Sequence, residues 1–232
     1  MAQHIGIVAC STEGAALCYR TVCTEGERLM GRYRHPEVSV HTPPFVDYVR
    51  CFDQGDWAAV GELMLASARK LTACGADFLI CPDNTIHQAF SYMESRSPLP
   101  WLHIAEVVAE SAQRRGFRRV GLMGTKWLVE SEVYPERLAA RDISYLRPSI
   151  EDRIETSRVI MEELVRGHFE PSSVARFQQV IQKFRDQGAD AVILGCTEIP
   201  LIVDDTNSPL PTLDSTCLLA QAAVRRAIAA ER

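Results

Sequence analysis

The feature that most constrains the fold is an internal repeat. Residues 70–85 align with residues 183–198, and each segment reads as the end of a helix, a glycine, Ala-Asp, an apolar strand and a polar turn. The positions that are identical in this register are, in the first segment, Lys70, Gly75, Ala76, Asp77 and Ile80. A shorter match aligns residues 5–8 with residues 120–123, each with glycine in second place. The matched segments lie about half the chain apart, so the sequence predicts two copies of one structural unit.

Short apolar runs alternate with longer amphipathic segments, which is the pattern of parallel sheets covered by helices on both faces. The expected strands are residues 4–10, 38–41, 78–81, 101–103, 120–124 and 191–194. The expected helices are residues 56–74, 105–115, 151–166, 172–187 and 215–230. We therefore predict an α/β fold with two similar lobes, each a mostly parallel sheet flanked by helices, related by a pseudo-two-fold axis. The first lobe is expected to comprise residues 1–103 with 212–232, and the second residues 104–211.

Composition excludes several classes of protein. A net charge of -5 and the absence of any Lys/Arg run longer than two residues exclude a nucleic-acid partner. No stretch approaches the roughly 20 apolar residues that span a bilayer. Residues 1–10 read as a strand and not as a secretion signal, so we expect no membrane partner and a cytoplasmic location. The eight cysteines include no CxxC pair, which favours buried apolar thiols over disulfides or a zinc site.

The repeat also predicts where a ligand binds. Ligands of open parallel sheets bind beyond the carboxyl ends of the strands. The register of the repeat gives Asp83 the position that Cys196 has in the second copy, and gives Asn84 the position of Thr197. We therefore expect an active site in a cleft between the two lobes, where these turns face each other.

Cys196 is the leading candidate for a catalytic group. It follows a buried strand and Gly195, and the residues after it are expected to start a helix with Thr197 near the cap. Backbone amides and a helix dipole lower the pKa of a thiol from about 8.5 toward neutrality. A thiolate in this turn is suited to act as a base, a nucleophile or a proton donor. Thr197 and Glu198 are expected to bind substrate.

The matching turn of the first lobe carries a second set of candidates. Asn84 and Thr85, with the amides of a helix start, suit a substrate carboxylate. Asp83 is a base, a group that orients an ammonium, or an N-cap. Cys81, Asp83 and His87 have neither the spacing of a metal motif nor a fourth ligand, so no metal site is predicted and His87 is expected to be structural.

Hydroxyl groups follow the first strand of each lobe, namely Ser11 and Thr12 in one and Thr125 in the other. Together with nearby amides they can bind the anionic part of a substrate. Helix capping is an equally simple interpretation, and both stay open. The sequence has no G-x-G-x-x-G or P-loop fingerprint, which counts against a nucleotide cofactor.

Four motifs resemble those of the aspartate/glutamate racemase family. They are PLPWLHI at residues 98–104, NTIH at residues 84–87, GTK at residues 124–126 and LGCTEIP at residues 194–200. The match runs nearly end to end. The resemblance implies a two-lobed α/β racemase that acts on a small amino acid or related carboxylate, forms a homodimer and needs neither pyridoxal phosphate nor metal.

The resemblance also implies roles for individual residues. Cys196 is one of two bases on opposite faces of Cα, and Asn84, Thr85 and Thr197 hold the α-carboxylate. The second base of the family is commonly a cysteine, but Asp83 occupies that position here. A lysine that the family uses for the distal carboxylate of the substrate aligns near Glu155, which would repel an acidic side chain.

Two other functions remain open at this point. A decarboxylase of the arylmalonate type uses a single cysteine in the second lobe to protonate a carbanion, and Cys196 fits that role. A protein that binds a small carboxylate without chemistry would need the same turns. The fate of the Cα hydrogen and of the carboxyl group distinguishes the three.

Overall fold

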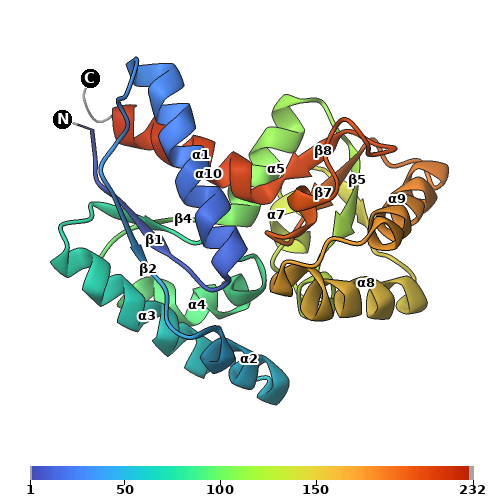
Figure 1. The fold of residues 1–232 in the computed structure, drawn as a ribbon, viewed down its shortest axis with the longest axis horizontal. Coiled ribbons are helices and arrows are strands. Elements are labelled where there is room, and N and C mark those ends of the chain that lie inside the picture. Colours follow the sequence, from blue (N-terminus) through green and yellow to red (C-terminus); the bar gives the residue numbers. More distant parts are fainter. Residues whose placement is uncertain (1, 230–232) are drawn as a thin grey trace. The chain divides into compact units, whose positions relative to one another are not determined.

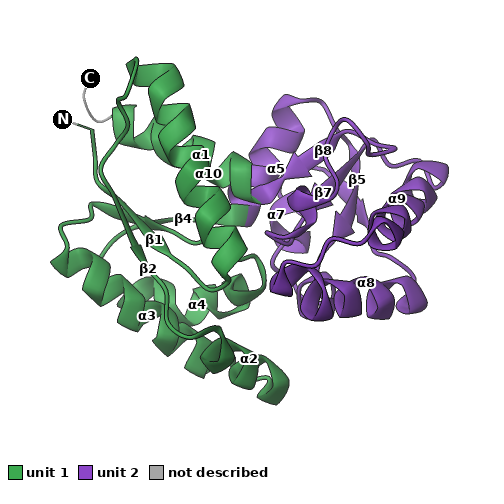
Figure 2. Cartoon of the chain, in the orientation of Figure 1, with its two compact units in different colours: residues 1–104, 216–232 green, residues 105–215 purple. Residues whose placement is uncertain are grey.

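The computed structural model describes residues 2–229, and these form two compact units. Unit 1 comprises residues 1–104 with 216–232, and unit 2 comprises residues 105–215 (Figures 1 and 2). Within the described part of the chain, no helix combines the length and the apolar character needed to cross a membrane.

Unit 1 is built on a four-stranded parallel sheet with strand order β2-β1-β3-β4. Its strands are β1 (Ile5–Val8), β2 (Val38–His41), β3 (Phe78–Ile80) and β4 (Trp101–Leu102). Its helices are α1 (Thr12–Met30), α2 (Phe45–Gln54), α3 (Trp57–Ala73), α4 (Phe90–Met93) and α10 (Ser215–Ala229), with short 3₁₀ turns η1 (Thr85–Ala89) and η2 (Glu94–Arg96). Helices α1 and α3 cover opposite faces of this sheet (Figure 1), as right-handed crossovers require.

Unit 2 repeats this arrangement with a parallel sheet of order β6-β5-β7-β8. Its strands are β5 (Arg119–Met123), β6 (Ser144–Leu146), β7 (Ala191–Leu194) and β8 (Thr212–Asp214). Its helices are α5 (Ile104–Arg114), α6 (Lys126–Val129), α7 (Pro135–Ala139), α8 (Ile150–Glu162) and α9 (Pro171–Asp186), with 3₁₀ turns η3 (Leu164–Arg166) and η4 (Ile199–Leu201). Corresponding strands occupy corresponding positions in the two sheets, so the predicted α/β fold with two similar lobes is confirmed.

The segment around residues 212–215 differs from its expected place. These residues were assigned to the first lobe, but β8 pairs with β7 and completes the sheet of unit 2. The expected helix 151–166 divides into α8 and η3, and a glycine in the left-handed conformation, Gly167 (φ 75°), ends the second part. Residue 230 of the expected helix 215–230 lies outside the described residues.

The Gly-Ala-Asp pattern that the two copies of the repeat share has the same structural role in both units. Gly75 and Gly188 have φ values of +89° and +83°, so each lets the chain leave its helix in a conformation that other residues rarely adopt. The carboxylate of Asp77 then accepts the His4 N–H at 2.7 Å. The carboxylate of Asp190 accepts the Arg119 N–H at 2.9 Å. Each aspartate thereby fixes the start of the strand next to its own.

The glycines of the shorter repeat, Gly6 and Gly121, lie on the central strands where a helix packs closest. A Cβ at Gly121 would lie 2.3 Å from the ring of Phe184 on α9, and Phe184 is buried in a cluster with Phe177 and Val192. A Cβ at Gly6 would lie 2.6 Å from Cδ2 of Leu79, the end of a flexible side chain. Both strands need a residue without a side chain, but the aromatic neighbour of Gly121 has less freedom to move.

We expect Gly121→Ala to lower the free energy of unfolding by about 1–3 kcal/mol, because the added methyl group overpacks the core against Phe184. Gly6→Ala, the equivalent change in the other unit, is expected to cost less, because its nearest neighbour is the end of the Leu79 side chain and not an aromatic ring. The urea unfolding midpoints of the two variants and the wild type measure the difference. Equal losses in both variants would contradict the packing argument.

Candidate active site

The Asp83 side chain lies at the carboxyl edge of the unit 1 sheet and is held there by backbone amides. Its Oδ2 accepts the N–H groups of Cys10 at 3.1 Å and Ser11 at 3.4 Å, directly after β1. Hydrogen bonds from N–H groups to a carboxylate are charge-assisted and hold it firmly. Asp83 remains partly exposed, so it is a fixed carboxylate that a ligand can reach.

His87 holds the backbone of the same turn. Its Nδ1 lies 2.9 Å from the Asp83 carbonyl oxygen, and the Ile104 N–H points at its Nε2 at 3.5 Å. This pair of contacts places the ring proton on Nδ1, which donates to Asp83. Burial lowers the pKa of His87 to about 4, so the ring is neutral at pH 7. His87 is a structural residue of the Asp83 turn, stacked on Phe90 at 5.8 Å between ring centroids.

Cys81 is unsuited to proton transfer near neutral pH. The side chain is fully buried, and burial raises the pKa of its thiol well above the ordinary value. Its Sγ donates to the carbonyl oxygen of Asp83 at 3.7 Å. The thiol that lies nearest to the family's usual base position therefore packs in the core beside the turn.

The remaining unit 1 candidates surround Asp83 in sequence. Ser11 is the N-cap of α1, and its Oγ accepts the Gly14 N–H at 3.3 Å. Thr12 is the exposed first residue of that helix. Asn84 is buried and Thr85 half-buried at the start of η1, which is a 3₁₀ turn and not an α-helix.

A second set of groups lies at the carboxyl edge of the unit 2 sheet, where two glycines let β5 and β7 end close together. The Gly195 N–H donates to the Met123 carbonyl at 2.8 Å. A Cβ at Gly195 would lie 2.7 Å from that carbonyl oxygen, and a Cβ at Gly124 would lie 3.2 Å from the Gly195 oxygen. The close approach requires glycine at residue 195 and sets the position of Cys196 after it.

The Cys196 thiol is paired with the Glu198 carboxylate. Its Sγ donates to Oε2 of Glu198 at 3.0 Å, and the Thr197 hydroxyl donates to the same oxygen at 2.7 Å. Glu198 is 2% exposed, and within the described residues its other oxygen, Oε1, has no hydrogen-bond partner. Cys196 itself is 9% exposed. The site therefore holds a thiol and a carboxylate that accepts a hydrogen bond from it. The second oxygen of that carboxylate is buried and has no hydrogen-bond partner among the described residues.

The residues after Cys196 form a short 3₁₀ turn and not an α-helix. Only the three-residue turn η4 follows, and Thr197 does not cap it. The Asn207 side chain accepts the Asp204 N–H, and the Asp204 carboxylate accepts the Thr206 N–H, and such local bonds compete with helix continuation. The charge next to the thiol is consequently that of Glu198, and a helix dipole does not act on it.

Thr125, the hydroxyl residue at the end of β5, caps the short helix α6. Its Oγ1 accepts the Leu128 N–H at 3.3 Å, and its side chain is buried. The next amide, that of Lys126, donates to the Ser157 hydroxyl of α8 at 3.1 Å. The edge of β5 is thereby tied to α8.

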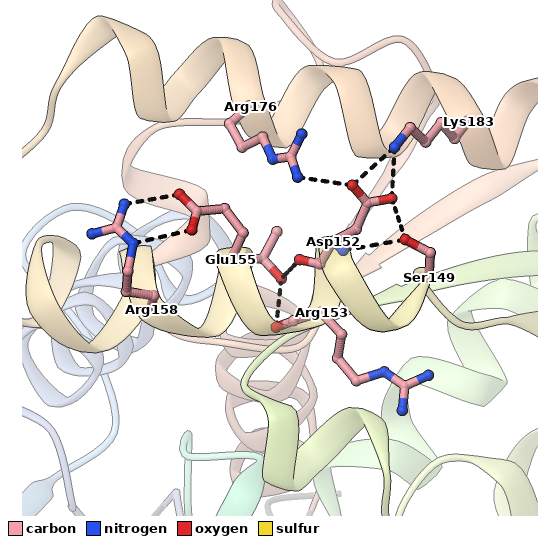
Figure 3. A network of polar contacts seen from close by, with 8 residues as sticks. Ser149, Asp152, Arg153, Glu155, Arg158, Arg176 and Lys183 are labelled. Atoms are coloured by element: carbon pink, nitrogen blue, oxygen red, sulfur yellow. Dashed lines mark hydrogen bonds and ion pairs between the residues drawn. The ribbon is translucent and has the colours of Figure 1, made fainter.

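Glu155, the residue near the family's lysine position, lies on α8 within a network of ion pairs (Figure 3). Arg158 bonds to both of its oxygens at 2.9 and 3.1 Å and lowers its pKa. One turn earlier, the buried Asp152 binds Lys183 at 2.7 Å and Arg176 at 3.0 Å. The negative charge of Glu155 is thus balanced within its own helix.

Tyr48 is a side chain of this region that the sequence analysis did not name. It is fully buried on α2, close to the groups at the edge of the unit 1 sheet. The described residues contain no group of three or more His, Cys, Asp or Glu side chains placed to hold a metal ion.

A sequence model of the family described as Asp/Glu/hydantoin racemase matches residues 7–223 of the chain. The broad-specificity amino-acid racemase RacX of Bacillus subtilis is 23% identical over 194 residues, which cover 82% of this chain and 81% of the relative.

Solved structures also match this chain over nearly its whole length. A candidate Asp/Glu racemase from Yersinia pestis superposes with a TM-score of 0.87 at 29% identity, over 97% of this chain and 99% of the other. An aspartate racemase homologue from Pyrococcus horikoshii shares the fold with a TM-score of 0.83 at 24% identity, over 97% and 99% of the two chains.

The neutral His87 predicts a pH dependence of stability. Because its folded-state pKa of about 4 lies below the ordinary value of 6.5, the unfolded chain binds the proton first as the pH falls. The neutral His87 therefore contributes about 3 kcal/mol to the free energy of unfolding above pH 6.5. This contribution is lost as the pH falls from 6.5 to 4. We expect His87→Asn, which cannot titrate there, to show a correspondingly shallower fall of the unfolding free energy over this range.

The control for this experiment is His168→Asn, because His168 is exposed. It should keep the wild-type slope in urea titrations at pH 4 to 7. A His87→Asn protein with the full wild-type slope would show that another group is responsible.

Proposed function

Because the chain belongs to the Asp/Glu/hydantoin racemase family, it is an isomerase, and we propose that it interconverts the enantiomers of an amino acid by moving the Cα proton without a cofactor. The observation that carries the proposal is the Cys196 thiol paired with Glu198 at the end of β7. A thiol has an ordinary pKa of about 8.5, near working pH, so it can both give and take a proton.

Cys196 is proposed as one of the two proton-transfer groups. In the thiol form it returns a proton to the carbanionic Cα, and in the thiolate form it removes one. Glu198 accepts a hydrogen bond from the thiol at 3.0 Å, so the carboxylate orients the thiol. The unpartnered Oε1 of Glu198 is proposed to accept a hydrogen bond from the substrate ammonium.

Asp83 is proposed as the second group. Support comes from its place in the repeat, opposite Cys196 in register, and from the two amides that orient its carboxylate. An ordinary carboxyl group has a pKa of about 3.9 and is therefore a base at pH 7. Removal of the Cα proton by Asp83 and its replacement by Cys196 completes one inversion, and the reverse sequence completes the other.

The substrate carboxylate must be held while charge builds on it. We propose Asn84, Thr85 and Thr197 for this role, with Ser11, Thr12 and Thr125 at the strand ends nearby in sequence. Hydrogen bonds to the developing enediolate lower the barrier because they strengthen as the charge forms. Ser11 and Thr125 also cap helices through their hydroxyl oxygens, which fixes the position of both side chains.

The side chain of the substrate is the least constrained part of the proposal. RacX is named for broad specificity, and the two solved relatives are named for aspartate or Asp/Glu. Arg158 balances Glu155, so that position supplies no free positive charge for a distal carboxylate. We propose that the substrate is an amino acid whose side chain is not required to be acidic.

One observation favours a second function. Only one of the two thiols usual in the family's proton-transfer positions is present, because Asp83 replaces the other. A single cysteine suffices for a decarboxylase that protonates a carbanion after loss of CO₂. Homodimer formation stays a prediction from the resemblance, and a cytoplasmic location stays a prediction from the sequence.

The test of the proposed function is deuterium incorporation at Cα in a screen of D- and L-amino acids. We expect the wild type to exchange the Cα hydrogen and to convert one enantiomer to the other. Cys196→Ser keeps the contact with Glu198 but is a much weaker acid, so its turnover should fall by about 10²–10⁴-fold. Cys74→Ser, at an exposed cysteine, is the control and should keep wild-type turnover.

Release of CO₂ from a malonate without exchange of the Cα hydrogen of any amino acid would show that the protein is a decarboxylase and not a racemase. Absence of both reactions would indicate a protein that binds a small carboxylate without chemistry. A Cys196→Ser variant with turnover close to that of the wild type would remove Cys196 from the mechanism.

The role of Asp83 is tested by Asp83→Asn. The new amide oxygen can still accept the Cys10 and Ser11 N–H groups, so the turn should keep its shape. If Asp83 transfers protons, deuterium wash-in from one enantiomer should collapse while the other still exchanges through Cys196. The control is Asp53→Asn, at an exposed position. Equal weakening of both enantiomers, chiefly in KM, would mean that Asp83 only binds the ammonium.

A further inference from the structure

Tyr48 is a buried residue whose hydroxyl group has no structural role. It lies in the first turns of α2, with an exposed fraction of 0%. Its ring stacks on that of Phe52 at 6.3 Å between centroids. The ring therefore has a clear packing function, which a phenylalanine would serve equally well.

The hydroxyl oxygen of Tyr48 has no hydrogen-bond partner among the described residues. Leaving a buried O–H group unsatisfied is unfavourable, because the group loses its bonds to water and gains nothing in exchange. Tyr134, an equally buried tyrosine of unit 2, does have a partner in Ser215. The contrast indicates that the Tyr48 hydroxyl forms its hydrogen bond with a bound ligand.

The surroundings of the hydroxyl identify the place and the kind of partner. Helix α2 follows β2, whose last residue, His41, pairs with Val8 at the end of β1. The chain thus reaches α2 from the sheet edge that carries Asp83. Burial raises the pKa of Tyr48 well above its ordinary value, and the charge of the Asp83 carboxylate raises it further. The hydroxyl is consequently always protonated and is a hydrogen-bond donor beside the Asp83 carboxylate.

We propose that Tyr48 is a substrate-binding residue whose hydroxyl donates a hydrogen bond to the carboxylate of the amino acid held at Asp83. The proposal rests on the proposed function and adds a donor from α2 to it. A carboxylate is the part of an amino acid that only accepts hydrogen bonds, whereas its ammonium only donates them. Since the carboxylate gains negative charge as Cα loses its proton, the bond should strengthen in the transition state.

The test is Tyr48→Phe, which removes only the hydroxyl. We expect kcat/KM to fall by about 10–100-fold for both enantiomers, which corresponds to loss of one hydrogen bond to a charged group. The midpoint of thermal unfolding should stay equal or rise, because an unsatisfied buried group is removed. Tyr134→Phe is the matched control for stability, and its midpoint should fall because a bond to Ser215 is lost.

Unchanged kcat/KM in Tyr48→Phe would overturn the proposal, and so would a lowered unfolding midpoint with unchanged kinetics, which would show a structural partner. Equilibrium dialysis with the same panel of D- and L-amino acids separates this proposal from the racemase itself. Weaker binding to Tyr48→Phe than to the wild type supports the role of Tyr48 even if the wild type exchanges no Cα hydrogen, an outcome that overturns only the racemase. Equal affinities of Tyr48→Phe and the wild type would overturn the proposed role of Tyr48, whatever reaction the wild type catalyses.

Discussion

Two carboxylates fix the strand register on which the rest of the structure depends. Asp77 binds the His4 amide, and Asp190 binds the amides of Arg118 and Arg119 at 2.7 and 2.9 Å. A slip of one residue in a strand would turn every side chain to the opposite face of the sheet. Because the register is fixed at the amino end of each central pair, the turns at the carboxyl end follow in fixed positions. Asp83 and Cys196 lie in those turns, so their placement is a consequence of the repeat.

The repeat explains how much of the fold the sequence could predict. Buried central strands such as β3 and β7 are continuous apolar runs, and long helices such as α3 and α9 have a clear amphipathic period, so their patterns identify them. Edge strands carry less signal. Strand β6 is Ser-Tyr-Leu with one exposed and two half-buried side chains, and β8 ends in an aspartate. These strands were found only through their pairing with β5 and β7, which is a long-range interaction.

The candidate site was predictable as a set of positions but not as a set of contacts. The sequence placed Cys196, Thr197 and Glu198 in one turn, and it could not show that the carboxylate folds back onto the thiol. A three-residue 3₁₀ turn follows Cys196 in place of a longer helix. The thiol therefore lies next to the negative charge of Glu198 and not at the positive end of a helix dipole. Tyr48 was missed because α2 was not expected, and no local pattern signals a hydroxyl that lacks a partner in the folded chain.

The two units share a fold but offer unlike chemistry, and the proposed reaction limits what this difference can do. One unit presents a carboxylate held by two amides, and the other a thiol held by a carboxylate. Enantiomers have equal free energies in water, so kcat/KM must be the same in both directions whatever groups carry the protons. A lower kcat for one enantiomer must therefore be matched by a proportionally lower KM for that enantiomer. Duplication gave two equivalent positions for proton transfer, and thermodynamics allows different residues to occupy them without favouring either product.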